Sequence, residues 1–341
     1  MYKAAIFEQV GQPLAIRELP DLTPGEGQLL VKVHRCGICG SDLHMTQGHG
    51  YTVPAGTVLG HEFTGEVIGK GAGELPFVEG EVVVAMPISG CARCGACLNG
   101  EPSYCESISY LFGGYAEFAL VSAHTASLLP SRVSAGDGAL TEPLAVALHG
   151  VAMAGIVPGC RVLVQGAGPI GLAALFWARR MGAGRVDVIE GASGRADLAR
   201  RMGADHVHAP RLPEENQFGP ADPDGQYDLV IECVGRPGIL GQAIARTRRG
   251  GTIVSLGYCF QGDSIVPALA SAREVRLLFP QLYTMQEFRW ALEVLDQGAV
   301  EPREMLTQTV KLDRLPETFE GLRANPEQCK VLVDPSSELQ S

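Results

Sequence analysis

The sequence predicts an α/β protein of two domains: a doubly wound parallel sheet in the middle of the chain and a mainly β domain split around it. Three observations favour this fold class. At 341 residues the chain exceeds the usual size of a single hydrophobic core. Strands and helices alternate from residue 161 to 279, as in a doubly wound sheet. Residues 1–90 instead form short strands broken by glycine and proline, which is typical of a partly open β-barrel.

The central sheet is predicted from six apolar strands separated by helices. These strands cover residues 161–165, 185–190, 206–209, 227–234, 251–257 and 275–279, and a helix over residues 144–154 precedes them. The polar segment 211–226 is expected to be a surface loop. Beyond residue 280 we expect an amphipathic helix over 286–295 and a closing strand over 330–334 in the first domain. The predicted domains are therefore residues 1–147 with 280–341, and residues 148–279.

The clearest motif is Val162-Leu-Val-Gln-Gly166-Ala-Gly168-Pro169-Ile170-Gly171, an apolar strand that turns through three glycines into a helix. Gly166 permits the tight turn, Gly168 lets a pyrophosphate approach the backbone, and Gly171 lets the helix pack closely on the strand. The helix N-terminus adds unpaired N–H groups that favour an anion. A lone GxGxxG is a weak signal, but between a strand and a helix it is the dinucleotide-binding fingerprint of a Rossmann domain.

The choice of dinucleotide depends on Glu190, which ends the next strand 19 residues after Gly171. A carboxylate at this place accepts hydrogen bonds from ribose hydroxyls and repels a 2′-phosphate. The sequence therefore favours NAD over NADP. Arg195, five residues further on, keeps NADP as an alternative.

Four cysteines, Cys91, Cys94, Cys97 and Cys105, lie within fifteen residues, with glycines between them. Their spacing allows a closed tetrahedron around one zinc ion, and a site without an open position is structural. An iron–sulfur cluster also uses four thiolates but usually has a different closing pattern. Four unconnected buried thiols seldom lie so close together. We therefore expect a structural zinc lobe over residues 91–105.

A second metal site is predicted from Cys39 and His61. A catalytic zinc takes three protein ligands and leaves the fourth position for water or substrate. Glu142 is the candidate third ligand, because Pro143 places it at the start of an apolar helix. Taken alone, each residue is better explained by a structural role: Cys39 as a buried thiol, His61 as a hydrogen-bonded histidine and Glu142 as a helix-start carboxylate. The three favour a catalytic site only in combination with the dinucleotide motif.

These motifs resemble, in order and spacing, those of the zinc-dependent medium-chain alcohol dehydrogenases, over essentially the whole chain. The segments that carry the resemblance are Cys39-Gly-Ser-Asp-Leu-His44, Gly60-His61-Glu62, the zinc lobe, Glu142-Pro143-Leu and the glycine motif. The chain looks most like the sorbitol, butanediol and threonine dehydrogenase branch, which uses a carboxylate as third zinc ligand. The resemblance implies a GroES-like catalytic domain, two zinc ions per chain, and Glu62 as a fourth carboxylate that exchanges with water.

The resemblance also implies roles for residues around the second metal site. Asp42 matches an acid that orients the ligand His61 by accepting a hydrogen bond from its distal N–H. Ser41 matches a proton-relay hydroxyl and His44 the histidine that passes the proton on, for which an unperturbed pKa close to physiological pH is suitable. Without the motif, Ser41 would be a turn residue and His44 a surface histidine. Arg195 matches an arginine that flanks the adenine or ribose of NAD.

The function that the resemblance implies is reversible, NAD-linked oxidation of a secondary alcohol, diol or polyol to the ketone, by a homo-oligomer that is a dimer or a tetramer. An NADP-linked carbonyl reductase, a primary-alcohol dehydrogenase of the same fold and a non-catalytic NAD-binding structural protein stay open. A formal charge of −11 argues against nucleic-acid and anionic-membrane partners. Without a signal-like N-terminus or a membrane-length apolar stretch, the expected location is cytoplasmic.

Overall fold

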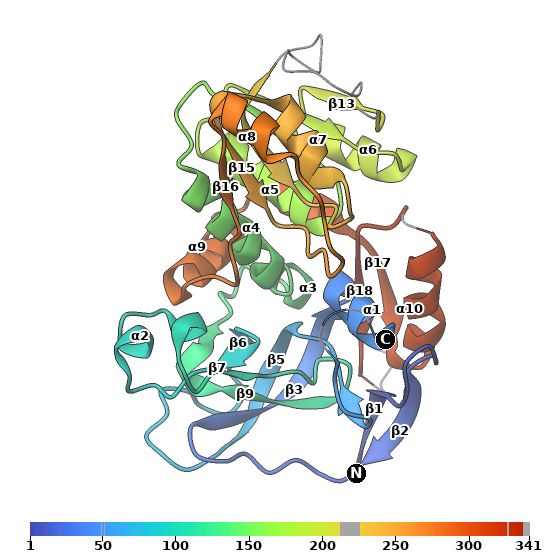
Figure 1. Ribbon diagram of the computed structural model, residues 1–341. Coiled ribbons are helices and arrows are strands. Elements are labelled where there is room, and N and C mark those ends of the chain that lie inside the picture. The colour runs from blue at the N-terminus through green and yellow to red at the C-terminus, as the bar shows by residue number, and fades with distance from the viewer. Residues whose placement is uncertain (49, 51, 212–225, 326, 337–341) are drawn as a thin grey trace. The chain divides into compact units, whose positions relative to one another are not determined.

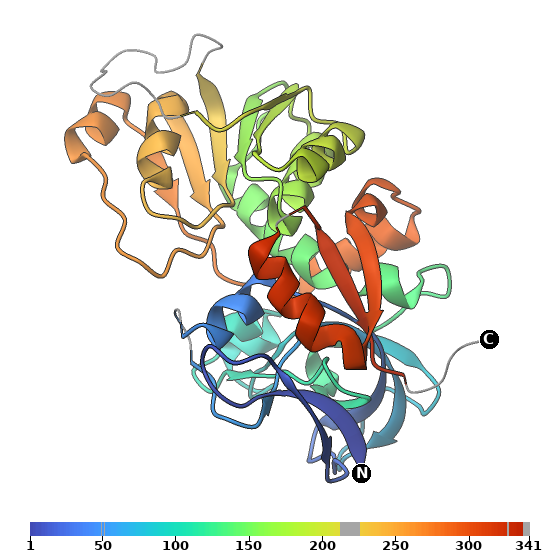
Figure 2. The ribbon, with the colours of Figure 1, turned by 90° about the vertical axis from the view of Figure 1, so that its right-hand side faces the viewer.

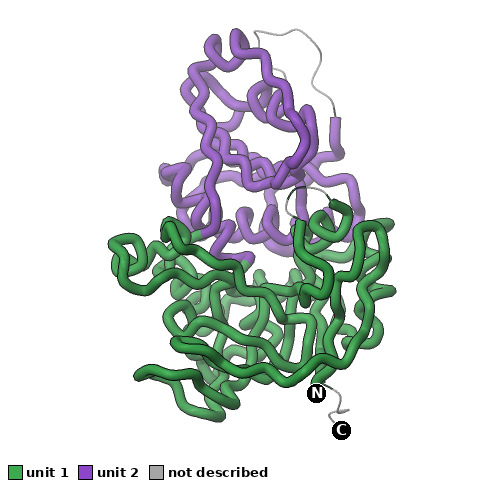
Figure 3. Tube along the Cα trace, turned by 60° about the horizontal axis from the view of Figure 1, so that its bottom comes forward, with its two compact units in different colours: residues 1–142, 283–341 green, residues 143–282 purple. Residues whose placement is uncertain are grey.

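The computed structural model describes residues 1–48, 50, 52–211, 226–325 and 327–336. The chain folds into two compact units, shown in Figure 3. Unit 1 consists of Met1–Glu142 and Tyr283–Ser341, and unit 2 of Pro143–Leu282. Unit 1 is thus discontinuous in sequence, and its boundaries lie a few residues from those expected at 147 and 280.

Unit 2 contains a six-stranded parallel sheet in the order β13-β12-β11-β14-β15-β16. Numbered along the unit, this is the 3-2-1-4-5-6 order of a Rossmann domain, so the predicted doubly wound fold is confirmed. The strands are β11 (Arg161–Gln165), β12 (Arg185–Ile189), β13 (His206–His208), β14 (Tyr227–Glu232), β15 (Thr247–Ser255) and β16 (Arg276–Leu278).

Two pairs of helices cover this sheet (Figure 1). Helices α5 and α6 pack together beside β11–β13, and α7 and α8 pack together beside β14 and β15. Residues 171–178 of α5 are all buried, as expected for a helix that is apolar on every side. The bounds are α5 (Pro169–Arg180), α6 (Ser193–Arg201), α7 (Ile239–Arg246) and α8 (Pro267–Arg273), and α4 (Thr141–Ala154) leads the chain into the unit. Of the expected loop 211–226, residues 212–225 lie outside the described residues.

Unit 1 is built on a seven-stranded sheet, with a three-stranded and a two-stranded sheet beside it. The large sheet runs β10-β6-β5-β3-β18-β17, with β9 also paired to β3, and its strand pairs are antiparallel except for β17 and β18. Its strands are β3 (Gln28–Gly37), β5 (Glu62–Lys70), β6 (Val82–Ala85), β9 (Phe118–Ser122), β10 (Ala126–Leu128), β17 (Leu306–Lys311) and β18 (Lys330–Asp334). The small sheets contain β1 (Tyr2–Phe7), β2 (Ala15–Leu19) and β4 (Thr57–Val58), and β7 (Ile88–Ser89) and β8 (Ser109–Tyr110).

The last part of the chain completes the sheet that the first part begins. Strand β18 pairs with β3, with Leu332 opposite Gly37 and Val333 opposite Cys36. In Figures 1 and 2 the red C-terminal elements accordingly lie beside the blue N-terminal ones. The helices of unit 1 are α1 (Gly40–Thr46), α2 (Gly95–Leu98), α3 (Ala135–Gly138), α9 (Met285–Asp296) and α10 (Leu315–Ala324), with short 3-10 turns at Pro102–Tyr104, Ala123–Thr125, Glu301–Met305 and Leu312–Arg314. None of the helices in the described parts of the chain is both long enough and apolar enough to cross a bilayer.

Candidate active site

Cys39 lies where β3 ends and α1 begins. It is the N-cap of α1, with extended backbone (φ −99°, ψ 149°), and its thiol accepts from the backbone N–H of Asp42. The Ser41 hydroxyl donates to the same sulfur at 3.3 Å. The start of α1 and these two donors fix the position of the Cys39 sulfur.

His61 and Glu62 enter the same site at the start of β5. Gly60 turns the chain here with φ +83°, and both side chains that follow it are buried. One ligand atom from each of Cys39, His61 and Glu62 lies within 4.8 Å of the other two. A thiolate, an imidazole and a carboxylate at this separation form a ligand set suited to zinc.

Glu142 lies beside this set but, within the described part of the structure, is not a member of it. It occupies the first turn of α4 as expected, is 5% exposed, and accepts a hydrogen bond from the Tyr283 hydroxyl at 3.1 Å. Burial, reinforced by the charge of Glu62, raises the pKa of Glu142 to about 7. The structure therefore groups Cys39 and His61 with Glu62, and the third-ligand role of Glu142 stays a prediction.

Asp42 faces His61 as the sequence analysis expected. Its Oδ1 lies 3.3 Å from His61 Nδ1, and its side chain is fully buried. Burial alone would lower the pKa of His61, but the charges of Asp42 and Cys39 outweigh it and hold the pKa well above the ordinary value. The site thus favours a cation at His61, either a proton or a metal ion.

Lys330 is a site residue that the sequence analysis missed. Its Nζ lies 2.8 and 2.6 Å from the two oxygens of Glu62, and it donates to the Ile38 carbonyl at 3.0 Å. The available signal was a lysine at the head of the apolar strand 330–334. Three carboxyl groups, those of Asp42, Glu62 and Glu142, and the Cys39 thiol lie here with Lys330 and His61. This excess of acidic groups fits a divalent cation.

Two further interactions hold the walls of the site. Arg323 on α10 donates to the Leu43 carbonyl at 2.7 Å and to the Thr46 hydroxyl at 2.5 Å, and so ties down the end of α1. The ring of Phe112 meets the His61 ring edge-on, with centroids 6.1 Å apart. His49 and Tyr51, which could line the site or close a turn, lie outside the described residues.

The four-cysteine lobe forms a second potential metal site. One sulfur from each of Cys91, Cys94, Cys97 and Cys105 lies within 4.8 Å of the others, and all ten cysteines of the chain are free. The Cys94 N–H donates to Cys91 Sγ at 3.3 Å, and hydrogen bonds from backbone N–H groups lower the pKa of Cys91 to about 6. Four thiols gathered in this way fit a closed zinc site.

The glycine motif in unit 2 has the geometry of a dinucleotide-binding turn. Gly166 has φ +91°, and a Cβ at Gly171 would lie 1.9 Å from the Gly166 carbonyl oxygen, so both positions require glycine. Helix α5 begins at Pro169 with Gly168 as its N-cap, which places Ile170 in the first turn. The resulting N-terminus is open to an anion.

Glu190 and Arg195 flank this turn. The Glu190 carboxylate accepts hydrogen bonds from the backbone N–H groups of Ala167 at 2.8 Å, Gly191 at 2.7 Å and Ala192 at 2.8 Å. It therefore links the glycine turn to the segment after β12. Arg195 Nη1 lies 3.8 Å from the position of a Cβ at Gly168, so the guanidinium is close to the turn as well.

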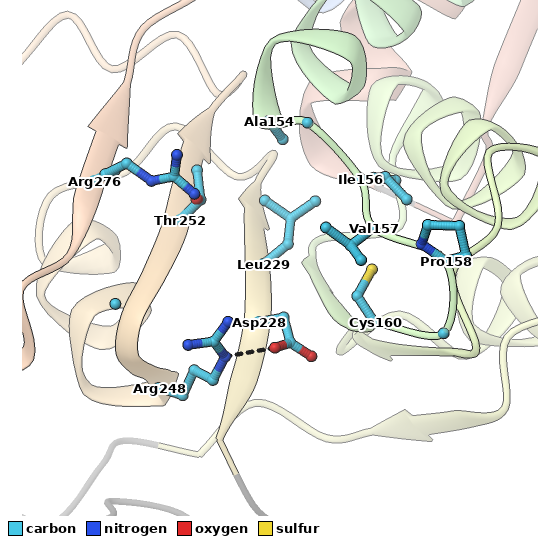
Figure 4. A pocket seen from close by; sticks show the side chains of 13 residues that line it. Ala154, Ile156, Val157, Pro158, Cys160, Asp228, Leu229, Arg248, Thr252 and Arg276 are labelled. Atoms are coloured by element: carbon cyan, nitrogen blue, oxygen red, sulfur yellow. Dashed lines mark hydrogen bonds and ion pairs between the residues drawn. The ribbon is translucent and has the colours of Figure 1, made fainter.

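A cavity of about 330 Å³ opens elsewhere in unit 2, around the amino ends of β14 and β15 (Figure 4). Arg248 and Asp228 lie side by side in its lining, with Nε donating to Oδ1 at 2.5 Å, and Cys160 lines the cavity as well. None of the predicted site residues, as far as the structure describes them, lines this cavity. Dinucleotides bind at the carboxyl ends of parallel strands, so this cavity is not the expected cofactor site.

Comparisons with known proteins show the family of the chain. Residues 25–131 match the alcohol dehydrogenase GroES-like domain, and residues 169–297 match the zinc-binding dehydrogenase domain. Sorbitol dehydrogenase from Bacillus subtilis (strain 168) is 30% identical over 98% of this chain and 97% of its own length. The chain belongs to the zinc-dependent medium-chain alcohol dehydrogenases.

Two solved structures extend the comparison of this alcohol dehydrogenase. Acetophenone reductase from Geotrichum candidum NBRC 4597, in complex with NAD, superposes with a TM-score of 0.88 at 26% identity, covering 99% of this chain and 98% of that one. A Sinorhizobium meliloti 1021 protein described as a zinc-binding dehydrogenase, bound to NADP, has a TM-score of 0.86 at 32% identity, covering 98% and 99%. The dehydrogenase is thus similar to structures with either nicotinamide cofactor.

The two residues predicted to relay a proton lie on one short helix. Ser41 and His44 are three positions apart on α1, which places them on the same face. Ser41 is fixed by its bond to Cys39 Sγ. Their transfer of a proton remains a prediction.

Proposed function

We propose that this dehydrogenase catalyses the reversible, NAD-linked and zinc-dependent oxidation of a secondary alcohol, diol or polyol to the ketone. The observation that carries the proposal is the ligand set of Cys39, His61 and Glu62, with Glu142 beside it, in a chain that also contains the dinucleotide turn. Such a set binds through three protein atoms and leaves a position for a substrate oxygen. When bound, zinc lowers the pKa of a coordinated hydroxyl and NAD accepts the hydride.

The protein groups around this position move the proton. The Ser41 hydroxyl, 3.3 Å from Cys39 Sγ, is beside the ligand set and can both accept and donate a hydrogen bond. It takes the proton of the substrate hydroxyl and passes it to His44, one turn further along α1. His44 releases it to solvent, a role for which histidine is suited as a residue type because the free imidazole titrates near physiological pH.

The carboxylates divide the work of holding the metal. Cys39 and His61 are ligands in every version of the proposal, with Glu142 as the third and Glu62 as the ligand that exchanges with water. Glu62 already has a partner in Lys330 at 2.6 Å, which can hold its carboxylate when it is not a ligand. Asp42 orients the His61 ring and raises its basicity as a ligand.

Glu190 supports NAD as the cofactor. A carboxylate has about four acceptor positions, and three are occupied by backbone N–H groups, two of them on Oε1 and one on Oε2. Oε2 can thus accept one more bond, from a ribose hydroxyl. A 2′-phosphate would meet the same negative charge, and Arg195 is the group that could offset it.

A secondary alcohol, diol or polyol is the proposed substrate class because two similar proteins are named for sorbitol, which is a polyol, and for acetophenone, which is a ketone. We further propose a cytoplasmic homo-oligomer, a dimer or a tetramer, whose mass light scattering would give. The deciding experiment combines metal analysis with NADH absorbance over a panel of secondary alcohols, diols and polyols. Two zinc ions per chain and turnover with a member of the panel are expected. One zinc ion, bound by the lobe, without turnover would instead support a structural protein.

A further inference from the structure

Tyr115 is a fully buried residue next to the metal site for which the proposed function has no role. It follows the glycines 113–114 between β8 and β9, and its hydroxyl donates to Asp42 Oδ2 at 2.5 Å. We propose that Tyr115 is a positioning residue for the catalytic zinc site, acting on His61 from two sides: through Asp42 and through Gly60. The inference rests on the proposed function, because it takes the Cys39–His61 set to be a zinc site.

The first path runs through the Asp42 carboxylate. Oδ2 accepts from Tyr115, and Oδ1 lies 3.3 Å from His61 Nδ1. A carboxylate is planar, so fixing one oxygen fixes the direction in which the other points. The second donor to Oδ2 is the Cys39 N–H at 3.4 Å, which is a much longer contact. Tyr115 is therefore the stronger of these two restraints on the acid that faces His61.

The second path runs through the backbone that carries His61. A Cβ at Gly60 would lie 2.6 Å from Tyr115 Cδ1, so the tyrosine ring packs directly against this residue. The Tyr115 N–H donates to the Leu59 carbonyl at 3.0 Å, and the Gly114 N–H donates to the Gly60 carbonyl at 2.9 Å. The ring and its backbone thus hold the turn from which His61 projects.

A buried tyrosine needs a hydrogen-bond partner in any case, so the test must separate positioning from plain stability. Unit 2 offers a matched control. The Tyr227 hydroxyl donates to Asp187 Oδ2 at 2.7 Å, and both side chains are as buried as those of Tyr115 and Asp42. Asp187 belongs to neither metal-ligand set. Tyr227→Phe therefore removes the same kind of bond without touching a metal site.

The experiment compares Tyr115→Phe with Tyr227→Phe in the full-length protein. Phenylalanine keeps the ring against Gly60 and removes the bond to Asp42. Residues that hydrogen-bond to metal ligands typically contribute about 10–100-fold to metal affinity. Asp42→Asn should therefore lower the zinc affinity by about that factor. Tyr115→Phe, which acts one hydrogen bond further from the metal, should lower it by about 3–10-fold. Affinity is measured by chelator competition with zinc, and cobalt spectra distinguish the Cys39 site from the four-thiolate lobe. Tyr227→Phe should lower the melting temperature yet keep wild-type metal affinity.

A double variant tests whether the hydroxyl acts through Asp42. In an Asp42→Asn background, Tyr115→Phe should cause little further loss, because coupled residues are not additive. Full additivity, or wild-type metal affinity in Tyr115→Phe, overturns the inference. Should Tyr115→Phe fail to fold, 4-aminophenylalanine at position 115, a weaker donor, carries the test and should reduce affinity below that of tyrosine; unchanged affinity overturns the inference. A wild-type protein that binds metal only in the lobe overturns the proposed function as well, so the two failures are distinguishable.

Discussion

Lys330 and Glu62 form a buried ion pair across 268 positions of sequence, with Nζ 2.6 and 2.8 Å from the two carboxylate oxygens. Their side chains are 2% and 0% exposed. Burial alone would lower the pKa of Lys330, but the charge of Glu62 outweighs it and raises the pKa, so the lysine is charged at neutral pH. A C-terminal strand thus supplies the counter-charge for a carboxylate of the N-terminal metal site.

Removing this counter-charge should destabilise the protein. Lys330→Met leaves the Glu62 carboxylate buried without its partner, which typically costs about 3–5 kcal/mol. Adding Glu62→Gln removes the uncompensated charge, so the double variant should recover much of the loss. Denaturant unfolding of zinc-free protein would measure both. If the double variant were no more stable than Lys330→Met, Lys330 would stabilise the protein by some means other than its ion pair with Glu62.

The third zinc ligand can be identified by comparing two carboxylates. Glu142→Gln keeps the size of the side chain and the start of α4 but removes a negative charge. We therefore expect the zinc content to fall from two ions to about one ion per chain and most hydride transfer to be lost. NAD affinity, measured by fluorescence titration, should not change. Glu62→Gln with Lys330→Met is the matched variant, and it should retain more zinc than Glu142→Gln. The reverse order would make Glu62 the third ligand, as its place within 4.8 Å of Cys39 and His61 allows.

The four-cysteine lobe should contribute stability rather than chemistry. Cys94→Ser breaks a closed site whose metal supplies folding energy. We expect the loss of one zinc ion and a lower melting temperature, with turnover per folded chain much less affected. Cys160→Ser, which changes a thiol of unit 2 outside both metal-ligand sets, serves as control. Normal stability combined with complete loss of turnover in Cys94→Ser would contradict the assignment.

Cofactor preference should respond to Glu190. In Glu190→Ala the bond to a ribose hydroxyl is lost, and hydrogen bonds to charged groups contribute about 1.5–3 kcal/mol, so KM for NAD should rise by about tenfold or more. The backbone bonds of Glu190 are lost too, so NADP should also bind differently, but with a smaller increase in KM. Initial rates with both cofactors would decide this. Equal increases would remove the reason for preferring NAD.

Asp187 makes the stability of unit 2 depend on pH. Burial alone would raise the pKa of Asp187, but hydrogen bonds from Arg185 and Tyr227 outweigh it and hold the pKa below its ordinary value. A carboxylate of this kind stabilises the fold above its unfolded pKa of about 4, and the contribution is lost as pH falls through the folded value. Asp187→Asn should therefore be less stable than wild type at pH 7. The difference in melting temperature should shrink in acid, and a constant difference would contradict this.

The features that sequence could predict are local. The glycine turn, the six strands of unit 2 and the cysteine lobe each depend on spacings within a few residues, and the fold class follows from them. The candidate ligand Cys39 and its neighbour Asp42 came from one short motif, and the structure places Asp42 at His61.

The features that sequence could not predict join distant segments. Lys330, Tyr115 and Tyr283 each contact a carboxyl group at the metal site, and Arg323 contacts the end of α1, all from at least 73 positions away. A lysine in an apolar strand and a tyrosine after two glycines carry no sign of which carboxylate they meet. The same limit applies to Glu62 and Glu142, because only a fold shows which of two carboxylates lies nearer to Cys39.

The discontinuity of unit 1 sets an order of events during synthesis. Ribosomes deliver a chain from its N-terminus, and domains generally fold as units while they emerge. Cys39, His61 and Glu62 emerge early, but β18, with Lys330, and Arg323 of α10 emerge only after the whole of unit 2. Until then Glu62 lacks its cation and α1 lacks its tether. The nascent chain therefore acquires the complete metal pocket only after unit 2 has been synthesised, whereas the cysteine lobe, encoded within fifteen residues, can capture a metal ion much earlier.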